Sequence, residues 1–186
     1  MVETTSTDNW HKGAFTALVA ECEKAREEGK YAFVWDKNGN APMFFKYKGQ
    51  LIDIGPLIVG KAIGQKTDAD IAEYLRSQMV VGQRSGDKVM IALGKTAPKW
   101  DEIHTEGVFH PQLVFDRTEW FKEENYIKFV KEEENHSVGG LNPGMYRLMD
   151  ETFSLTVCSQ ADSEEEVLKQ VAALPHADKF KLMVIS

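Results

Sequence analysis

Apolar residues along the chain alternate between helical spacing and short continuous runs. A helix is predicted between Asp8 and Gly29, because its apolar positions recur three or four residues apart and glycine favours a helix C-terminus: Trp10, Ala14, Leu18, Cys22 and Ala25. A second helix is predicted from Thr67 to about Val80, with Asp70 placed to complete a capping box. Its apolar face would consist of Ile71, Leu75 and Met79.

Short runs rich in branched and aromatic residues predict strands. YAFVWD, MFFKY and LIDI, separated by DKNGNAP and by Lys48-Gly49, favour antiparallel hairpins over residues 31–54. KVMIAL and QLVFD are further strand candidates, and residues 57–59 fit either a buried strand or the first turn of a helix. Asp116 and Glu119 predict the capped start of a helix that runs to about Glu133, followed by a glycine-rich loop.

The end of the chain predicts a βαβ unit. TFSLTVC reads as a strand, Ser163 and Glu166 as the capping box of an amphipathic helix, and FKLMVIS as a closing strand. The expected fold is α/β, or α+β, in one layered domain over residues 9–186 with a mixed sheet. Residues 1–8 are expected to form a flexible N-terminal tail.

Composition narrows the class of protein. The 186-residue chain is 42% hydrophobic and carries a net charge of −7, without the basic stripe that nucleic-acid binding requires. No run of 18 apolar residues and no secretory leader pattern is present, so neither membrane insertion nor secretion is expected. Cys22 and Cys158 match no metal or redox spacing and are expected to be buried thiols, although a disulfide between them stays open. An intracellular location, cytoplasmic or cytoskeletal, is therefore expected.

One stretch, GKAIGQKT at residues 60–67, resembles the phosphate-binding P-loop, G-x-x-x-x-G-K-[ST]. Gly60, Lys66 and Thr67 fall in register, whereas Gln65 stands where the loop needs its second glycine. The resemblance covers about eight residues and no more of the chain.

A degenerate P-loop implies weak binding of an Mg-nucleotide without hydrolysis. Gly60, Gly64 and Lys66 would surround the phosphates, while Thr67 and Asp116 would lie near magnesium. A chance match explains the same residues, because such strings are common and Asp116 also serves as a helix cap. No other cofactor is predicted.

Catalytic and metal-binding patterns are otherwise missing from the sequence. His104, Glu106 and His110 are residue types that bind metals, but their spacing matches no metal motif, and solvated loop histidines explain them better. The chain has no G-x-S-x-G motif and no local signature of a catalytic serine or cysteine. We therefore predict no catalytic residues and no metal site.

Surplus aromatic residues point to a partner instead. On the helix after Asp116, Phe121 and Phe129 fall opposite Trp120. The expected hairpin adds Trp35, Phe44, Phe45 and Tyr47. These aromatics either join the core, or lie under the glycine-rich loop in the case of Phe121 and Phe129, or form an exposed interface.

The sequence thus favours a non-catalytic intracellular protein that acts through protein–protein contacts or as a structural subunit of a larger assembly. Its expected partner is another protein or a second copy of the chain. The alternative is the P-loop-like nucleotide-binding protein.

Overall fold

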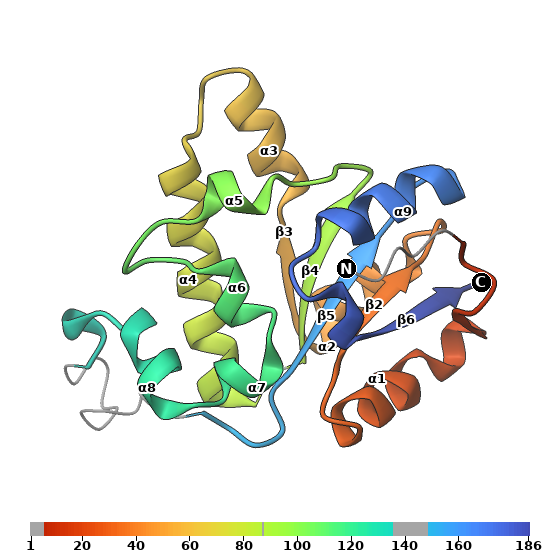
Figure 1. Cartoon of the computed structure of the whole chain (residues 1–186), viewed down its shortest axis with the longest axis horizontal. Helices are drawn as coiled ribbons and strands as arrows, with labels where there is room; N and C mark the ends of the chain where they lie inside the picture. The colour runs from red at the N-terminus through yellow and green to blue at the C-terminus, as the bar shows by residue number, and fades with distance from the viewer. Residues whose placement is uncertain (1–5, 87, 136–148) are drawn as a thin grey trace.

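A computed structural model describes residues 6–86, 88–135 and 149–186, which form a sheet of six strands between two layers of helices (Figure 1). The strands are β1 His11–Gly13, β2 Tyr31–Trp35, β3 Gln50–Asp53, β4 Lys88–Gly94, β5 Ser154–Ser159 and β6 Phe180–Ile185. Their order in the sheet is β1-β6-β2-β5-β4-β3. Every pair of neighbouring strands is parallel. The α/β prediction is confirmed, and the prediction of a mixed sheet is wrong.

The predicted antiparallel hairpins over residues 31–54 are replaced by a strand, a helix and a strand. Helix α2, Asn40–Lys48, connects β2 to β3, and these two strands are not neighbours in the sheet. Asp36 explains why the segment is helical, since its buried carboxylate accepts hydrogen bonds from the backbone N–H groups of Asn38 and Ala41. Pro42 lies in the first helical turn, where its missing N–H costs nothing.

In the part of the chain that the structure describes, two α-helices cover one face of the sheet. Helix α1, Leu18–Glu27, and α2 pack there on a small core. The residues of this core include Leu18, Cys22, Ala41, Phe45, Met90, Cys158 and Met183. Both cysteines are buried free thiols.

The other face carries a larger core and most of the helices. Helix α3, Gly55–Ala62, α4, Asp68–Ser85, and α9, Glu164–Ala173, belong to this layer, together with short helices after β4. The short helices are α5 Trp100–Ile103, α6 Pro111–Val114, α7 Arg117–Trp120, α8 Glu123–Tyr126, and the 3₁₀ turns η2 Ile127–Phe129 and η3 Glu132–Asn135. None of the described helices is both long enough and apolar enough to cross a membrane.

Several local predictions are confirmed. The capping boxes of Thr67 with Asp70 and of Ser163 with Glu166 are both formed. Gly29 follows α1 with φ of +72°, the left-handed conformation that glycine favours. Strand β5, α9 and β6 form the predicted parallel unit, with β2 inserted between the two strands.

Other segments differ from the predictions. Trp10 packs on Phe33 and precedes the edge strand β1, and after η1, Phe15–Ala17, helix α1 begins only at Leu18. The predicted strand QLVFD is instead α6, which begins at Pro111.

Asp116 caps a helix as expected, but α7 ends at Trp120. The chain then turns, and the rings of Trp120 and Phe129 meet 4.8 Å apart in the core. A single long helix could not bring both residues to that core. The glycine-rich loop, residues 136–144, lies outside the described residues, as do residues 1–5 of the predicted tail. Within the tail, Thr7 is buried and donates two hydrogen bonds to Glu164.

Candidate functional site

The P-loop-like stretch connects α3 to α4 rather than a strand to a helix. Gly60 is buried within α3, and its carbonyl accepts hydrogen bonds from the backbone N–H groups of Gln65 and Lys66, at 2.8 and 3.2 Å. Gly64 has φ of +74°, which allows the chain to turn back on the end of α3. These two N–H groups close the helix terminus and do not form an open cradle for a phosphate.

The magnesium-binding positions are separated from each other. The hydroxyl of Thr67 belongs to the capping box and donates to Asp70 Oδ2 at 2.8 Å. Asp116 is buried at the start of α7, where it accepts backbone N–H groups and pairs with Lys179. In Figure 1 the α3–α4 connection and α7 lie at opposite ends of α4, an 18-residue helix about 27 Å long. The structure therefore does not bring Asp116 to the loop.

Given this geometry, we expect that neither Mg-ATP nor Mg-GTP raises the thermal unfolding midpoint of the protein. A nucleotide at a hundredfold excess over its dissociation constant would add about 2.7 kcal/mol to the free energy of unfolding, an easily measured shift. Thermal scans of the native chain and of Lys66→Ala test this. A rise that Lys66→Ala abolishes would instead support the nucleotide-binding alternative.

The histidine cluster lies in the connection between α5 and α6. The rings of His104 and His110 have centroids 4.2 Å apart and are tilted by 44° to each other, and His104 Nε2 lies 3.7 Å from Glu106 Oε2. Burial, together with the neighbouring His104, lowers the pKa of His110. Among the described residues, no group of three or more histidine, cysteine or acidic side chains could hold a metal ion.

The six aromatic candidates separate into three places. Trp35 is buried at the end of β2, and its indole N–H donates to the carbonyl of Ala161. Phe129 is buried in the larger core, and Phe121 is half-buried against Phe153, beneath the Arg117 guanidinium. The remaining three are on α2: Phe44, Phe45 and Tyr47.

Helix α2 carries two apolar stripes on different sides. Ala41 and Phe45 face inward and are buried in the smaller core. Met43 and Tyr47, four residues apart, face outward, and 57% and 72% of their surfaces are exposed. A helix that packs on a single core needs only the first stripe.

The outer stripe borders a groove of about 320 Å³ between α2 and the 3₁₀ turn η1. Phe15 of η1 and Phe44 of α2 meet edge to face, with ring centroids 6.2 Å apart. The groove is lined by Phe15, Asn40, Met43, Phe44, Tyr47 and Lys48. Its wall is therefore almost entirely apolar and aromatic, which is typical of surfaces that bind a partner.

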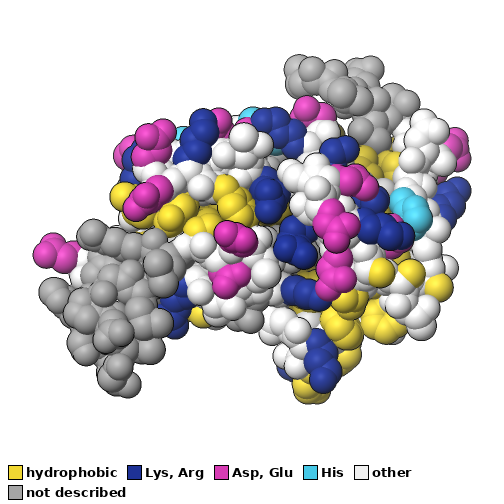
Figure 2. Space-filling view, turned by 90° about the horizontal axis from the view of Figure 1, so that it is seen from below, with side chains coloured by type: hydrophobic (Ala, Val, Ile, Leu, Met, Phe, Trp, Pro, Cys, Tyr) yellow, Lys and Arg dark blue, Asp and Glu magenta, His cyan; other side chains and the backbone are white. Residues whose placement is uncertain are grey.

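Basic side chains accompany this groove. Helix α2 contains Lys46 and Lys48 and no acidic residue, and both lysines are exposed. Neither lysine forms an ion pair with any described residue, whereas Lys61, Lys95 and Lys181 all do. Figure 2 shows hydrophobic and Lys or Arg side chains side by side at the lower right edge of that view. The α2 surface is thus apolar and locally basic on a chain of net charge −7.

Sequence reasoning selected Phe44 and Tyr47 but missed Phe15 and Met43. As parts of a strand, Phe44 and Tyr47 would face opposite sides, whereas helical spacing puts Asn40, Met43, Phe44 and Tyr47 along one stripe. That spacing was the available signal for Met43. Nothing local to Phe15 indicates its contact with α2, because Phe44 lies 29 residues further along the sequence.

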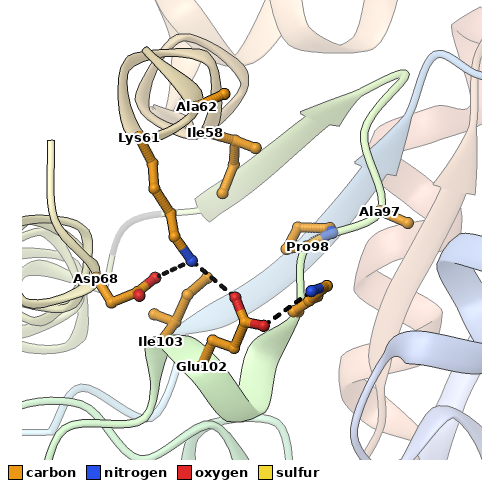
Figure 3. Close-up of a pocket in the computed structure, with 9 residues that line it drawn as sticks. Ile58, Lys61, Ala62, Asp68, Ala97, Pro98, Glu102 and Ile103 are labelled. Carbon is orange, nitrogen blue, oxygen red and sulfur yellow. Dashed lines mark hydrogen bonds and ion pairs between the residues drawn. The ribbon is translucent and has the colours of Figure 1, made fainter. Parts of the chain in front are cut away.

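A second cavity, of about 330 Å³, lies between α3, the start of α4 and α5 (Figure 3). Lys61 Nζ pairs with Asp68 and Glu102 at 2.7 Å each, and Lys99 also pairs with Glu102. Hydrogen bonds from the two lysines lower the pKa of Glu102 to about 2. Because these charged groups already neutralise one another, the cavity offers a ligand no free charge from this network.

Open parallel sheets usually bind ligands at the carboxyl ends of two neighbouring strands from which the chain leaves toward opposite faces of the sheet. In this sheet those strands are β2 and β5. Here the side-chain amide of Gln160 lies over Gly39, 2.5 Å from where a Cβ would stand. Lys95 and Asp162 pair across the same edge, and Asp36 is occupied in capping α2. Both the Lys95–Asp162 pair and the Asp36 carboxylate are thus engaged with other groups of the chain.

Over the described residues, the chain is an α/β protein whose strands are all parallel, and helix α2 has an apolar face that is open to solvent. Comparison of the chain with known protein families, curated proteins and solved structures finds no match.

Proposed function

We propose that this chain is a non-catalytic protein-interaction module that binds another protein through the outer face of α2. The observation that carries the proposal is the second apolar stripe of α2, where Met43 and Tyr47 are exposed beside a groove. Exposed apolar surface is unfavourable in water, and contiguous patches of it mark interaction sites. At the carboxyl edge of the sheet, Lys95, Asp162 and Asp36 already have partners within the chain, which also favours a binding role over catalysis.

The module would act inside the cell, in the cytoplasm or on the cytoskeleton, as a subunit of a larger assembly. Its two buried cysteines remain thiols, which fits a reducing compartment.

Photo-crosslinking tests this function. Benzoylphenylalanine at position 47 is expected to give a defined protein adduct in extracts of the source cells, whereas the same group at exposed position 30, in the turn before β2, is not. The adduct is identified by mass spectrometry, and the partner is then purified. We expect Met43→Ser with Tyr47→Ser to weaken its binding to the intact chain at least tenfold, because few residues dominate an interface.

Two results would contradict the proposal. One is crosslinking at position 47 no stronger than at position 30, and the other is a purified partner that binds the native chain and the double variant equally. Sedimentation of the native chain and of the variant distinguishes a second copy from a different protein as the partner.

A further inference from the structure

We propose that the α2 groove binds an amphipathic helix that carries acidic residues beside its apolar stripe, supplied by a different protein. This inference rests on the proposed function and names the class of partner. It follows from the shape of the groove and from the charge at its border.

The shape favours a helix over an extended strand. The groove lies between side chains of η1 and α2, and the stripe from Asn40 to Lys48 is about 12 Å long, slightly more than two helical turns. An added strand would instead need free backbone groups, which the described part of the sheet offers at its edges β1 and β3. A helix would lay large apolar side chains against Phe15 and the outer stripe of α2, the mode of recognition in which anchors recur at i, i+3, i+4 and i+7.

The charge favours acidic residues on that helix. Lys46 and Lys48 contribute two positive charges to α2 and have no ion-pair partner among the described residues. Their place in the last turn also suits the helix dipole, but the dipole does not account for the adjacent exposed stripe. Glutamate or aspartate flanking the apolar anchors would pair with both lysines at the rim. A basic helix would be repelled.

Fluorescence anisotropy with designed peptides tests the inference on the full chain. Three labelled helical peptides of equal length share one leucine stripe and differ in its flanking residues, which are Glu, Gln or Lys. We expect the Glu peptide to bind about tenfold more tightly than the Gln peptide, and the Lys peptide to bind most weakly. Because rim charges are screened, added salt should narrow these differences.

Matched variants locate the effect. In the double variant Lys46→Gln with Lys48→Gln, the affinity for the Glu peptide should fall to that for the Gln peptide. Tyr47→Ser should weaken the binding of both peptides. The control is Lys66→Gln, because Lys66 is likewise exposed and forms no ion pair with a described residue, yet it lies between α3 and α4. This control should leave all three affinities unchanged.

Equal affinity for the three peptides, or absence of binding by the Glu peptide, overturns the inference. So does a dimer that Tyr47→Ser dissociates, because a second copy then occupies the groove. In each case the proposed function is judged separately by crosslinking at position 47, which requires neither a helix nor an acidic partner.

Discussion

Replacement of the two carboxylates that surround Arg76, in the variant Glu73→Gln with Glu134→Gln, is expected to lower the free energy of unfolding by about 3 kcal/mol. Only 2% of the Arg76 side chain is exposed. Its guanidinium donates to both oxygens of Glu73, to both oxygens of Glu134 and to the carbonyl of Phe129, over 2.7 to 2.9 Å. Without the carboxylates, a buried positive charge remains uncompensated.

This loss of free energy of unfolding lies at the low end of the range for a broken buried ion pair, because the side chains of Glu73 and Glu134 are themselves 40% and 22% exposed. The contrasting variant is Arg76→Met. It removes the buried charge and leaves two carboxylates that reach water, with Lys131 still beside Glu73. We expect it to cost about 1–2 kcal/mol, mainly through the unpaired carbonyl of Phe129.

Urea unfolding of the three proteins measures both effects, with the slope of the transition checked for constancy. Equal costs, or a larger cost for Arg76→Met, would contradict the view that the buried guanidinium needs its counter-charges.

Acid should weaken the same network. Hydrogen bonds from Arg76 lower the pKa of Glu73 to about 2. Burial alone would raise the pKa of Glu134, but hydrogen bonds from Arg76 and from the backbone of Lys131 lower it overall. Their stabilisation is complete above the unfolded pKa of about 4.3 and is lost as pH falls toward 2. The variant with both glutamates replaced should therefore lose less stability than the native protein between pH 5 and pH 2.

The elements that sequence reasoning predicted well depend on local interactions. A capping box such as Thr67 with Asp70 needs only residues three positions apart, and both boxes formed. The strands β4, β5 and β6 are short apolar runs, since both faces of the sheet are covered by helices. For patterns of this kind, a few neighbouring residues are enough to determine the local structure.

Residues 40–48 show why the rest could not be predicted. Aromatic residues after an Asn-Gly pair are typical of a hairpin, and the helix requires Asp36 as its acceptor and β3 and β4 beneath it. The strand assignment also changed the candidate site, because it separated Phe44 from Tyr47. Only the tertiary fold brings Phe15 to α2 and thereby forms the groove.

Asp36→Ala is expected to lower the free energy of unfolding by about 2–3 kcal/mol, the second large effect we predict. Asp36 is fully buried, and its carboxylate accepts the N–H of Asn38 at 3.0 Å and that of Ala41 at 2.6 Å. Alanine would leave both donors without their acceptor and remove a negative charge from the positive end of α2. Asp36→Asn keeps one acceptor oxygen and should cost about 1 kcal/mol.

A matched control lies at the end of the edge strand. Asp53 accepts a hydrogen bond from the N–H of Gly55 at the start of α3, at 3.1 Å, but Asp53 is exposed. Because water can replace its carboxylate as the acceptor, Asp53→Ala should lower the free energy of unfolding by less than about 1 kcal/mol. Because Asp36 holds the first turn of α2, Asp36→Ala should also speed hydrogen exchange at the N–H of Ala41. It should weaken partner binding as well, although the variant keeps both Met43 and Tyr47. A stable Asp36→Ala protein with native exchange at Ala41 would mean that packing against the sheet alone holds α2, and with it the docking surface.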